Sequence, residues 1–307
     1  MRVSLRTGIG LLAATGTAVA LLTNSPTVDL IPSAAAAPTV AISDIKSTLN
    51  ELQKVADANG GTRRNGSAGY TASADYIAKT ATAAGLTVTK VPFNFQGTSG
   101  VNVIADLPGG DENDVTMFGA HLDSVPAGAG LTDNASGSAA VMAVAIAASK
   151  SSAKPKGHLR FAWWDAEETG LRGSLGYLAD TKTDKTKIKR YLNFDMVGQF
   201  KDTKTVWGLY GKGATEKAAF VEALKAKGFT TAPEAIAENR SDQASFERAG
   251  IPTAGLAGHL DGADGKPGPG GTAGCYHQAC DKLGRVDPAA VEVAANAAAT
   301  ALYKLAG

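Results

Sequence analysis

The chain has 307 residues, with 30 Lys and Arg against 29 Asp and Glu, so its formal net charge is +1. A near-neutral chain without basic blocks has no surface that neutralises phosphates, which argues against nucleic-acid binding. Hydrophobic residues make up 44% of the chain, a content typical of globular rather than disordered proteins. Two cysteines are too few for a disulfide scaffold.

The first 36 residues have the pattern of a secretory signal peptide. Arg2 and Arg6 give a positive start, residues 8–22 are uncharged and apolar, and residues 33–37 offer small side chains for cleavage. The apolar stretch is shorter than the about 20 residues that a membrane span needs. An uncleaved N-terminal anchor is the alternative. With cleavage after Ala36, we expect residues 37–307 to be a secreted, extracellular, formally neutral domain without membrane segments.

Segments with helical and strand-like patterns alternate along this domain. Helices are predicted over 43–58, with Ser43 as the cap, and over 71–84. Strands over 101–107 and 115–121 precede a helix over 133–149, and strands over 159–164, 191–196 and 206–210 follow. A helix over 216–227, a strand over 251–257 and a last helix from Asp287 and Pro288 complete the chain. The alternation predicts an α/β sandwich with a mostly parallel sheet.

Acidic residues and a histidine gather where the predicted strands stop, which is the end at which sites of α/β folds lie. Buried carboxylates without partners are costly, so several of them at one sheet edge point to a metal ion. Histidine together with carboxylates favours zinc over calcium or magnesium. One more histidine is needed, and His277 is the best candidate. The residues at the strand ends are His121, Asp123, Asp165, Glu167, Glu168 and Asp195, and Asp133 lies in the loop just before a predicted helix.

Two short spacings suggest roles within such a centre. His121 and Asp123 are two residues apart and share a face, so the carboxylate can bind the second ring nitrogen of a histidine ligand. The alternative is a surface histidine with an aspartate nearby. Glu167 and Glu168 follow a buried aromatic run, and one could bind metal while the other serves as general base. The alternative there is a solvated acidic turn.

Five blocks in order resemble the secreted co-catalytic zinc aminopeptidases, and the similarity runs from about Ala37 to the C-terminus. The blocks are GAHLDS (119–124), GLTDNASG (130–137), FAWWDAEE (161–168), NFDM (193–196) and CYHQAC (275–280). The resemblance implies two Zn²⁺ ions per chain. Such ions share a bridging carboxylate, polarise the peptide carbonyl and generate hydroxide near neutral pH. The implied metal ligands are Asp133 as the bridge, His121 and Asp195 on one zinc, and Glu168 and His277 on the other.

The resemblance also implies the remaining catalytic groups. Glu167 would be the general base, Tyr276 would donate a hydrogen bond to the oxyanion, and Arg240 matches a position near the substrate. The cysteine pair, Cys275 and Cys280, supports secretion and would hold Tyr276 and the neighbouring histidine ligand in place. Ala257 stands where the family has an aromatic wall of the side-chain pocket, so a preference for leucine itself is not predicted.

We therefore expect a single-domain three-layer sandwich with a mixed, mostly parallel, about eight-stranded sheet and helices on both faces. Its expected activity is hydrolysis of apolar N-terminal residues from peptides or proteins, by a monomer. The alternatives are a glutaminyl-cyclase-like acyl transferase with one zinc, a carboxypeptidase of the co-catalytic class, and a non-catalytic secreted binding protein. Retention of both His121 and Asp195 argues against the cyclase.

Overall fold

The computed structural model of the chain describes residues 36–199, 205–234, 240–258 and 275–307. The predicted signal peptide, apart from its last residue, lies outside the described residues. Among the described helices, none has the length and the apolar character that crossing a bilayer requires.

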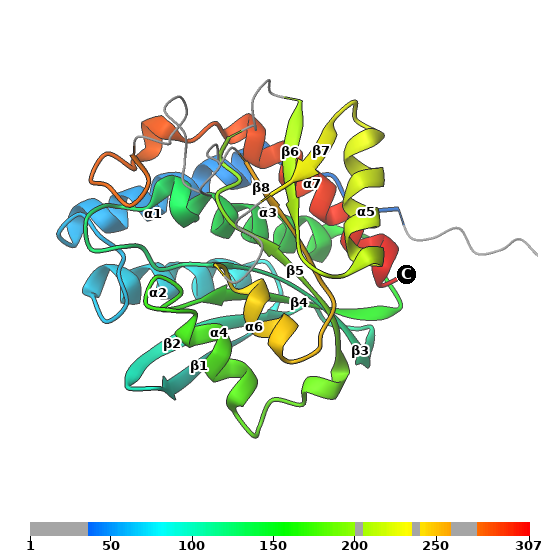
Figure 1. The fold of residues 1–307 in the computed structure, drawn as a ribbon, viewed down its shortest axis with the longest axis horizontal. Coiled ribbons are helices and arrows are strands. Elements are labelled where there is room, and N and C mark those ends of the chain that lie inside the picture. Colours follow the sequence, from blue (N-terminus) through cyan, green and yellow to red (C-terminus); the bar gives the residue numbers. More distant parts are fainter. Residues whose placement is uncertain (1–35, 200–204, 235–239, 259–274) are drawn as a thin grey trace, which may run out of the picture. The chain divides into compact units, whose positions relative to one another are not determined.

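An eight-stranded sheet, in the order β1-β2-β4-β3-β5-β8-β6-β7, forms the middle layer (Figure 1). Strands β4, β3, β5 and β8 run parallel to one another, and β6 and β7 form a second parallel pair. The pairs β1–β2, β2–β4 and β6–β8 are antiparallel, so the predicted mixed, mostly parallel sheet is confirmed. The strands are β1 (Thr87–Phe95), β2 (Thr98–Asp106), β3 (Asp111–His121), β4 (Gly157–Trp164), β5 (Ile188–Phe194), β6 (Val206–Tyr210), β7 (Thr230–Pro233) and β8 (Thr253–Ala257).

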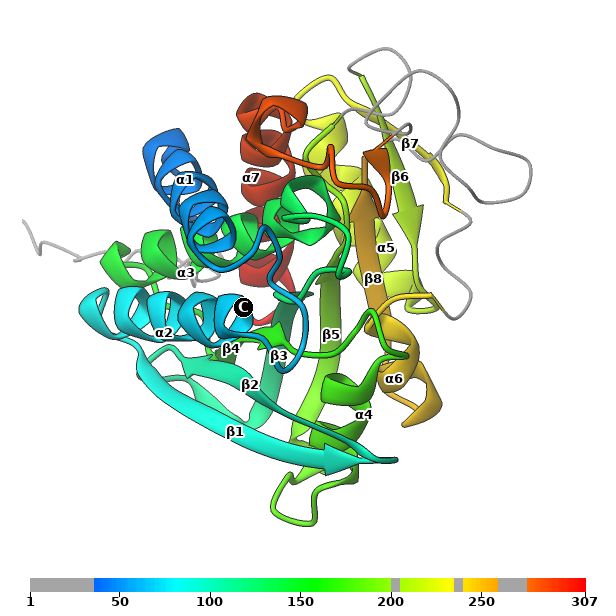
Figure 2. The same ribbon diagram turned by 90° about the vertical axis from the view of Figure 1, so that its left-hand side faces the viewer.

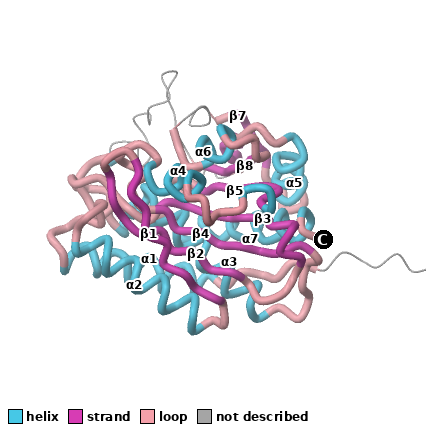
Figure 3. Tube along the Cα trace, turned by 90° about the horizontal axis from the view of Figure 1, so that it is seen from below, coloured by secondary structure: helices cyan, strands magenta, loops and turns pink. Residues whose placement is uncertain are grey.

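Helices cover both faces of this sheet (Figures 2 and 3). One face packs against α2 (Ala68–Ala83), α3 (Ser136–Lys150), α5 (Ala214–Lys225) and α7 (Pro288–Leu305). On the same side, α1 (Ile42–Ala58) packs on α3 and α7. The opposite face packs against the shorter α4 (Arg172–Ala179) and α6 (Gln243–Arg248). The predicted three-layer sandwich is therefore confirmed.

Alternation along the central strands builds the two cores. In β4, Phe161 and Trp163 join the larger core, whereas Ala162 and Trp164 join the smaller one. Successive side chains of a strand point to opposite faces, and here both faces are buried. This explains why the sequence shows a continuous apolar run there rather than an alternating one.

Several expectations from the sequence differ from the structure in detail. Ser43 is not the cap of α1, because Ala41 stands at that position and makes no side-chain cap bond, so this prediction is wrong. Asp287 does cap α7, and its side chain accepts a hydrogen bond from the backbone N–H of Ala289. Strands β1 and β7, and helices α4 and α6, were not expected. The two strands lie at the edges of the sheet and are largely exposed, so they lack the apolar run that marks the buried strands.

Gly255 in β8 makes room for a tyrosine that supports β5. A Cβ atom at residue 255 would lie 2.2 Å from the ring of Tyr210 and 2.5 Å from the backbone oxygen of Asn193. The side-chain amide of Asn193 donates to the hydroxyls of Tyr210 and Ser241, at 2.9 Å each. This buried network joins β5, β6 and the segment before α6.

We expect Gly255→Ala to lower the free energy of unfolding by about 2–3 kcal/mol, because the added methyl group overlaps the Tyr210 ring and the backbone. Denaturant unfolding of the purified protein measures this change. The matched control is Gly284→Ala, where a Cβ atom meets nothing within 4 Å. Equal stabilities of the two variants would contradict the expectation.

Candidate active site

Three adjacent parallel strands bring the predicted residues to one edge of the sheet. His121 ends β3, Glu167 and Glu168 follow β4, and Asp195 follows β5. In the β3–β4 ladder, His121 is the register partner of Trp164, the last residue of β4. The carboxyl ends of parallel strands meet at the same edge, so these side chains converge as expected.

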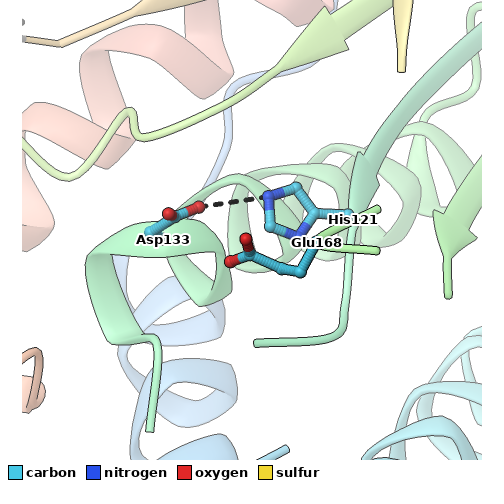
Figure 4. A group of neighbouring side chains, drawn as sticks. All are labelled: His121, Asp133 and Glu168. Carbon is cyan, nitrogen blue, oxygen red and sulfur yellow. Dashed lines mark ion pairs between the residues drawn. The ribbon is translucent and has the colours of Figure 1, made fainter. Parts of the chain in front are cut away.

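Asp133 lies between two histidines, one facing each of its carboxylate oxygens. Its Oδ1 is 3.1 Å from Nε2 of His121, and its Oδ2 is 3.2 Å from Nε2 of His277. Figure 4 shows Asp133, His121 and Glu168 turned toward one another. Asp195 approaches the first histidine at 3.6 Å, and Glu168 approaches the second at 3.0 Å. The five predicted ligands thus form two groups that share Asp133.

These separations fit zinc. Ligand atoms bound tetrahedrally at about 2.0–2.1 Å from one zinc ion lie roughly 3.3 Å apart, close to the separations found here. Three buried atoms of the site lack a hydrogen bond: Nε2 of His121, Oδ1 of Asp195 and Oε1 of Glu168. Buried polar atoms without partners are rare, and bound metal ions would satisfy all three. Potential ligand atoms of His121, Asp133 and Glu168 all lie within 4.8 Å of one another. The same holds for His121, Glu167 and Asp195.

Crowded carboxylates dominate the electrostatics of the site. Burial, with the charges of Asp195 and Glu168 nearby, raises the pKa of Glu167 well above its usual value. Burial and the charge of Asp133 raise the pKa of Glu168 to about 7. Both carboxyl groups resist ionisation because negative charge is concentrated away from water. The site can hold all of its carboxylates ionised only when cations lie among them.

The same negative charges stabilise the protonated forms of the two histidines. Burial alone would lower the pKa of His121, but Glu167, Asp123 and the two nearest carboxylates hold it well above the usual value. Burial likewise opposes the charge of His277, yet Asp133 and Glu168 raise its pKa to about 10. The field at this edge of the sheet therefore attracts positive charge.

Asp123 joins β3 to the loop after β4. Its Oδ1 lies 3.4 Å from Nδ1 of His121, and its backbone oxygen lies closer to the same nitrogen, at 3.2 Å. Its Oδ1 also accepts the backbone N–H of Glu167 at 3.1 Å, and Oδ2 accepts that of Glu168 at 3.3 Å. Asp123 thus orients both glutamates as well as the histidine. Its contacts with the two glutamate amides could not be inferred from its spacing to His121.

Asn134 was not expected to take part, and it links the Asp133 loop to the Asp195 loop. Its side-chain amide donates to the backbone oxygen of Phe194 at 2.8 Å. Its side-chain oxygen accepts the backbone N–H groups of Gly137 and Met196, at 2.9 and 3.2 Å. The only signal in the sequence was its place beside Asp133 in a glycine-flanked block.

A disulfide between Cys275 and Cys280 closes the turn that carries Tyr276 and His277. The rings of Tyr276 and His277 stack with centroids 3.8 Å apart. Burial, followed by the charges of Asp133 and neighbouring carboxylates, raises the pKa of Tyr276 above its usual value. The phenol therefore keeps its proton and is available as a hydrogen-bond donor.

Arg240 is exposed and precedes Ser241, whose hydroxyl accepts from Asn193 two residues before Asp195. Its expected place near a substrate stays a prediction. His158 lies elsewhere, with its ring nitrogens 2.7 Å from Asp106 and 2.8 Å from the backbone oxygen of Gly109.

A sequence model of peptidase family M28 matches residues 102–302. The chain belongs to peptidase family M28. Leupeptin-inactivating enzyme 1 of Streptomyces exfoliatus is 42% identical over 287 residues, which are 89% of this chain and 65% of that protein. The chain thus spans slightly less than two thirds of this curated relative.

Solved structures share the fold of this M28 chain. The LapA aminopeptidase of Legionella pneumophila superposes with a TM-score of 0.74 at 19% identity, over 87% of this chain and 71% of that chain. A glutaminyl cyclase of Bacteroides thetaiotaomicron, bound to N-acetylhistamine, superposes with a TM-score of 0.70 at 17% identity, over 87% of this chain and 99% of that chain. At these identities the likeness concerns the fold alone.

Asp165, at the start of the loop with Glu167, is a buried carboxylate that ties this loop to two other segments. Its Oδ2 accepts the side-chain amide of Asn65 at 3.0 Å and the backbone N–H of Val101 at 3.1 Å. Its Oδ1 has no hydrogen bond. Burial, with the charge of Asp123, raises its pKa from 3.8 to about 7.

We expect Asp165→Asn to stabilise the metal-free protein at pH 8 but not at pH 4. As pH rises from 4 to 7 the carboxyl ionises in the unfolded chain before the folded one, so the wild type loses stability across this window. The full difference corresponds to about 4 kcal/mol. The new amide leaves a donor unpaired, so the expected gain at pH 8 is on the order of 1 kcal/mol. Urea unfolding with a chelator present measures it.

Asp106→Asn is the control of opposite sign. Although burial opposes it, hydrogen bonds from His158 and Arg160 lower the pKa of Asp106, so its carboxylate stabilises the fold above pH 4. This variant should lose stability at pH 8. If Asp165→Asn also loses stability there, the inference about its buried charge is wrong.

Proposed function

We propose that this M28 chain is a two-zinc aminopeptidase that removes N-terminal residues, preferentially apolar ones, from peptides. The observation that carries the proposal is the placement of Asp133, with one carboxylate oxygen facing His121 and the other facing His277. A carboxylate shared between two histidine-containing groups is the arrangement that a bridged pair of metal ions requires. Membership of peptidase family M28 agrees with it.

Five residues would hold the ions. Asp133 would bridge them, His121 and Asp195 would bind one, and Glu168 and His277 would bind the other. When bound, the ions would act as Lewis acids that polarise the scissile carbonyl and increase the acidity of water. The buried atoms without hydrogen bonds in three of these five side chains support the assignment.

Glu167 is the group proposed to move the proton. Its carboxyl is buried, and its backbone N–H is fixed by Asp123. It would take a proton from water as the water oxygen bonds to the carbonyl carbon. It would then pass this proton to the amine as the C–N bond breaks. Burial among carboxylates raises its pKa and suits it to both steps.

Tyr276 and the surplus of acidic groups would serve the substrate. The protonated phenol of Tyr276 would donate a hydrogen bond to the oxygen that gains charge in the transition state. The carboxylates around it would attract a free α-ammonium group, which favours cleavage at the N-terminus. Tyr276 packs against a small apolar cluster of Met196, Tyr210 and Ala257, and this supports an apolar side chain in the substrate.

The signal-peptide pattern of residues 1–36, together with the disulfide, supports secretion. Disulfides persist in oxidising compartments outside the cytosol. We therefore propose that the domain of residues 37–307 acts outside the cell on peptide or protein N-termini.

Glu167→Gln should lower kcat on Leu-p-nitroanilide by about 10²–10⁴-fold, because the amide cannot accept the proton. Its zinc content should match that of the wild type, since Glu167 is outside the proposed ligand set. The control is Glu222→Gln, at an exposed glutamate paired with Lys304. If the zinc-loaded wild type does not cleave the anilide and Glu167→Gln behaves identically, the proposed activity is wrong.

The number of bound zinc ions distinguishes the proposed aminopeptidase from the glutaminyl-cyclase-like alternative. That alternative is considered because a glutaminyl cyclase shares the fold. We expect two zinc ions per chain by mass spectrometry under native conditions, and one in His121→Ala. One ion in the wild type, with cyclisation of an N-terminal glutamine peptide and no anilide hydrolysis, would favour the cyclase.

A further inference from the structure

Asp281 forms hydrogen bonds to the backbone of the loop that carries Asp133, the proposed bridging residue. One of its carboxylate oxygens accepts the N–H of Thr132 at 2.8 Å, and the other accepts the N–H of Asp133 at 3.0 Å. The residue is only 3% exposed. Both oxygens therefore accept from consecutive amides, which fixes the orientation of the two peptide units before Asp133.

The same carboxylate belongs to the turn that carries His277. Asp281 directly follows Cys280, whose disulfide to Cys275 closes the turn. Its own N–H donates to the backbone oxygen of Gln278 at 3.1 Å, and the N–H of Gln278 donates to that of Cys275 at 3.0 Å. The turn with His277 and the loop with Asp133 are thus joined through Asp281.

Arg63 holds the preceding part of this loop. Its guanidinium is fully buried and donates to the backbone oxygens of Leu122, Ala129 and Gly130. The carboxylate of Asp281 is among the negative charges that stabilise this cation. The Asp133 loop is therefore held at Gly130 by Arg63 and at its next amides by Asp281, so little backbone freedom remains where the carboxylate must face two histidines.

We propose that Asp281 is a positioning residue that sets the place of the Asp133 carboxylate relative to His277, and thereby the zinc affinity of the group formed by Asp133, Glu168 and His277. This inference rests on the two-zinc site proposed above. The simpler role is that Asp281 only caps the helical turn η1 (Leu131–Ala135). The two roles differ in their effect on metal affinity.

The test is Asp281→Asn, which has nearly the same shape but turns an NH₂ group toward one of the two amides. We expect one of the two zinc ions to bind about 10–100-fold more weakly in competition with a chelator, as for other residues that orient ligands. Binding of the second ion, which shares Asp133 but is bound by His121 and Asp195, should be weakened less. With zinc at saturation, kcat on Leu-p-nitroanilide should fall while KM changes less.

Asp287→Asn is the matched control, because Asp287 accepts the N–H of Ala289 at 2.9 Å at the start of α7, without contact to the site. It should leave both zinc affinities unchanged and the unfolding temperature close to that of the wild type, because asparagine caps a helix about as well as aspartate. If Asp281→Asn lowers the unfolding temperature while both zinc affinities stay at wild-type values, Asp281 is only a cap and the proposal is wrong.

A variant that does not fold also decides the question. If Asp281→Asn is unfolded, Asp281→Ser keeps one acceptor and is measured in the same way; failure of both to fold assigns Asp281 to the fold and overturns the proposal. A wild type that binds two zinc ions without cleaving peptides refutes the proposed activity, whereas the zinc affinities still test Asp281.

Discussion

The arrangement of the site follows from the cost of burying several carboxylates within a few ångströms of one another. Burial raises the pKa of Glu167 and Glu168, and the charges of neighbouring carboxylates add to the effect. Parallel strands bring these carboxylates together because they end at the same edge of the sheet. For the same reason, a cation at that edge is within reach of ligands from several strands. The histidines, the buried Arg63 and the proposed zinc ions all compensate for this concentration of charge.

Such a site requires a rigid frame, and that frame consists largely of hydrogen bonds between side chains and backbone amides. Asp123 holds the glutamate loop, Asn134 holds the loop after β5, and Asp281 holds the amides beside Asp133. Each of these side chains forms hydrogen bonds through both terminal atoms of its carboxylate or amide group. A carboxylate or amide with every oxygen committed fixes orientation better than a single bond.

The sequence allowed most of the fold and the proposed ligands to be predicted, for two physical reasons. Buried central strands have to be apolar, so the segments around Trp163 and Phe194 stood out, and residues that follow such strands share one edge. Edge strands lack this constraint: β1 is mostly exposed and was not expected. Asn134, Asp281 and Arg63 could not be found in this way, because they act on backbone groups that are distant in sequence or carry no residue-specific signal. Arg63, for example, binds carbonyl groups about 60 residues further along the chain.

The disulfide-closed turn near the C-terminus has a consequence for when the site can form. β3, β4 and β5 provide their residues before β8, whereas His277 and Asp281 come after β8, the last strand of the described residues. During synthesis, the proposed ligand set therefore stays incomplete until the segment after β8 has emerged and the turn has docked on the Asp133 loop. Because a proposed ligand follows β8 in the chain, completion of the metal centre is coupled to completion of the sheet.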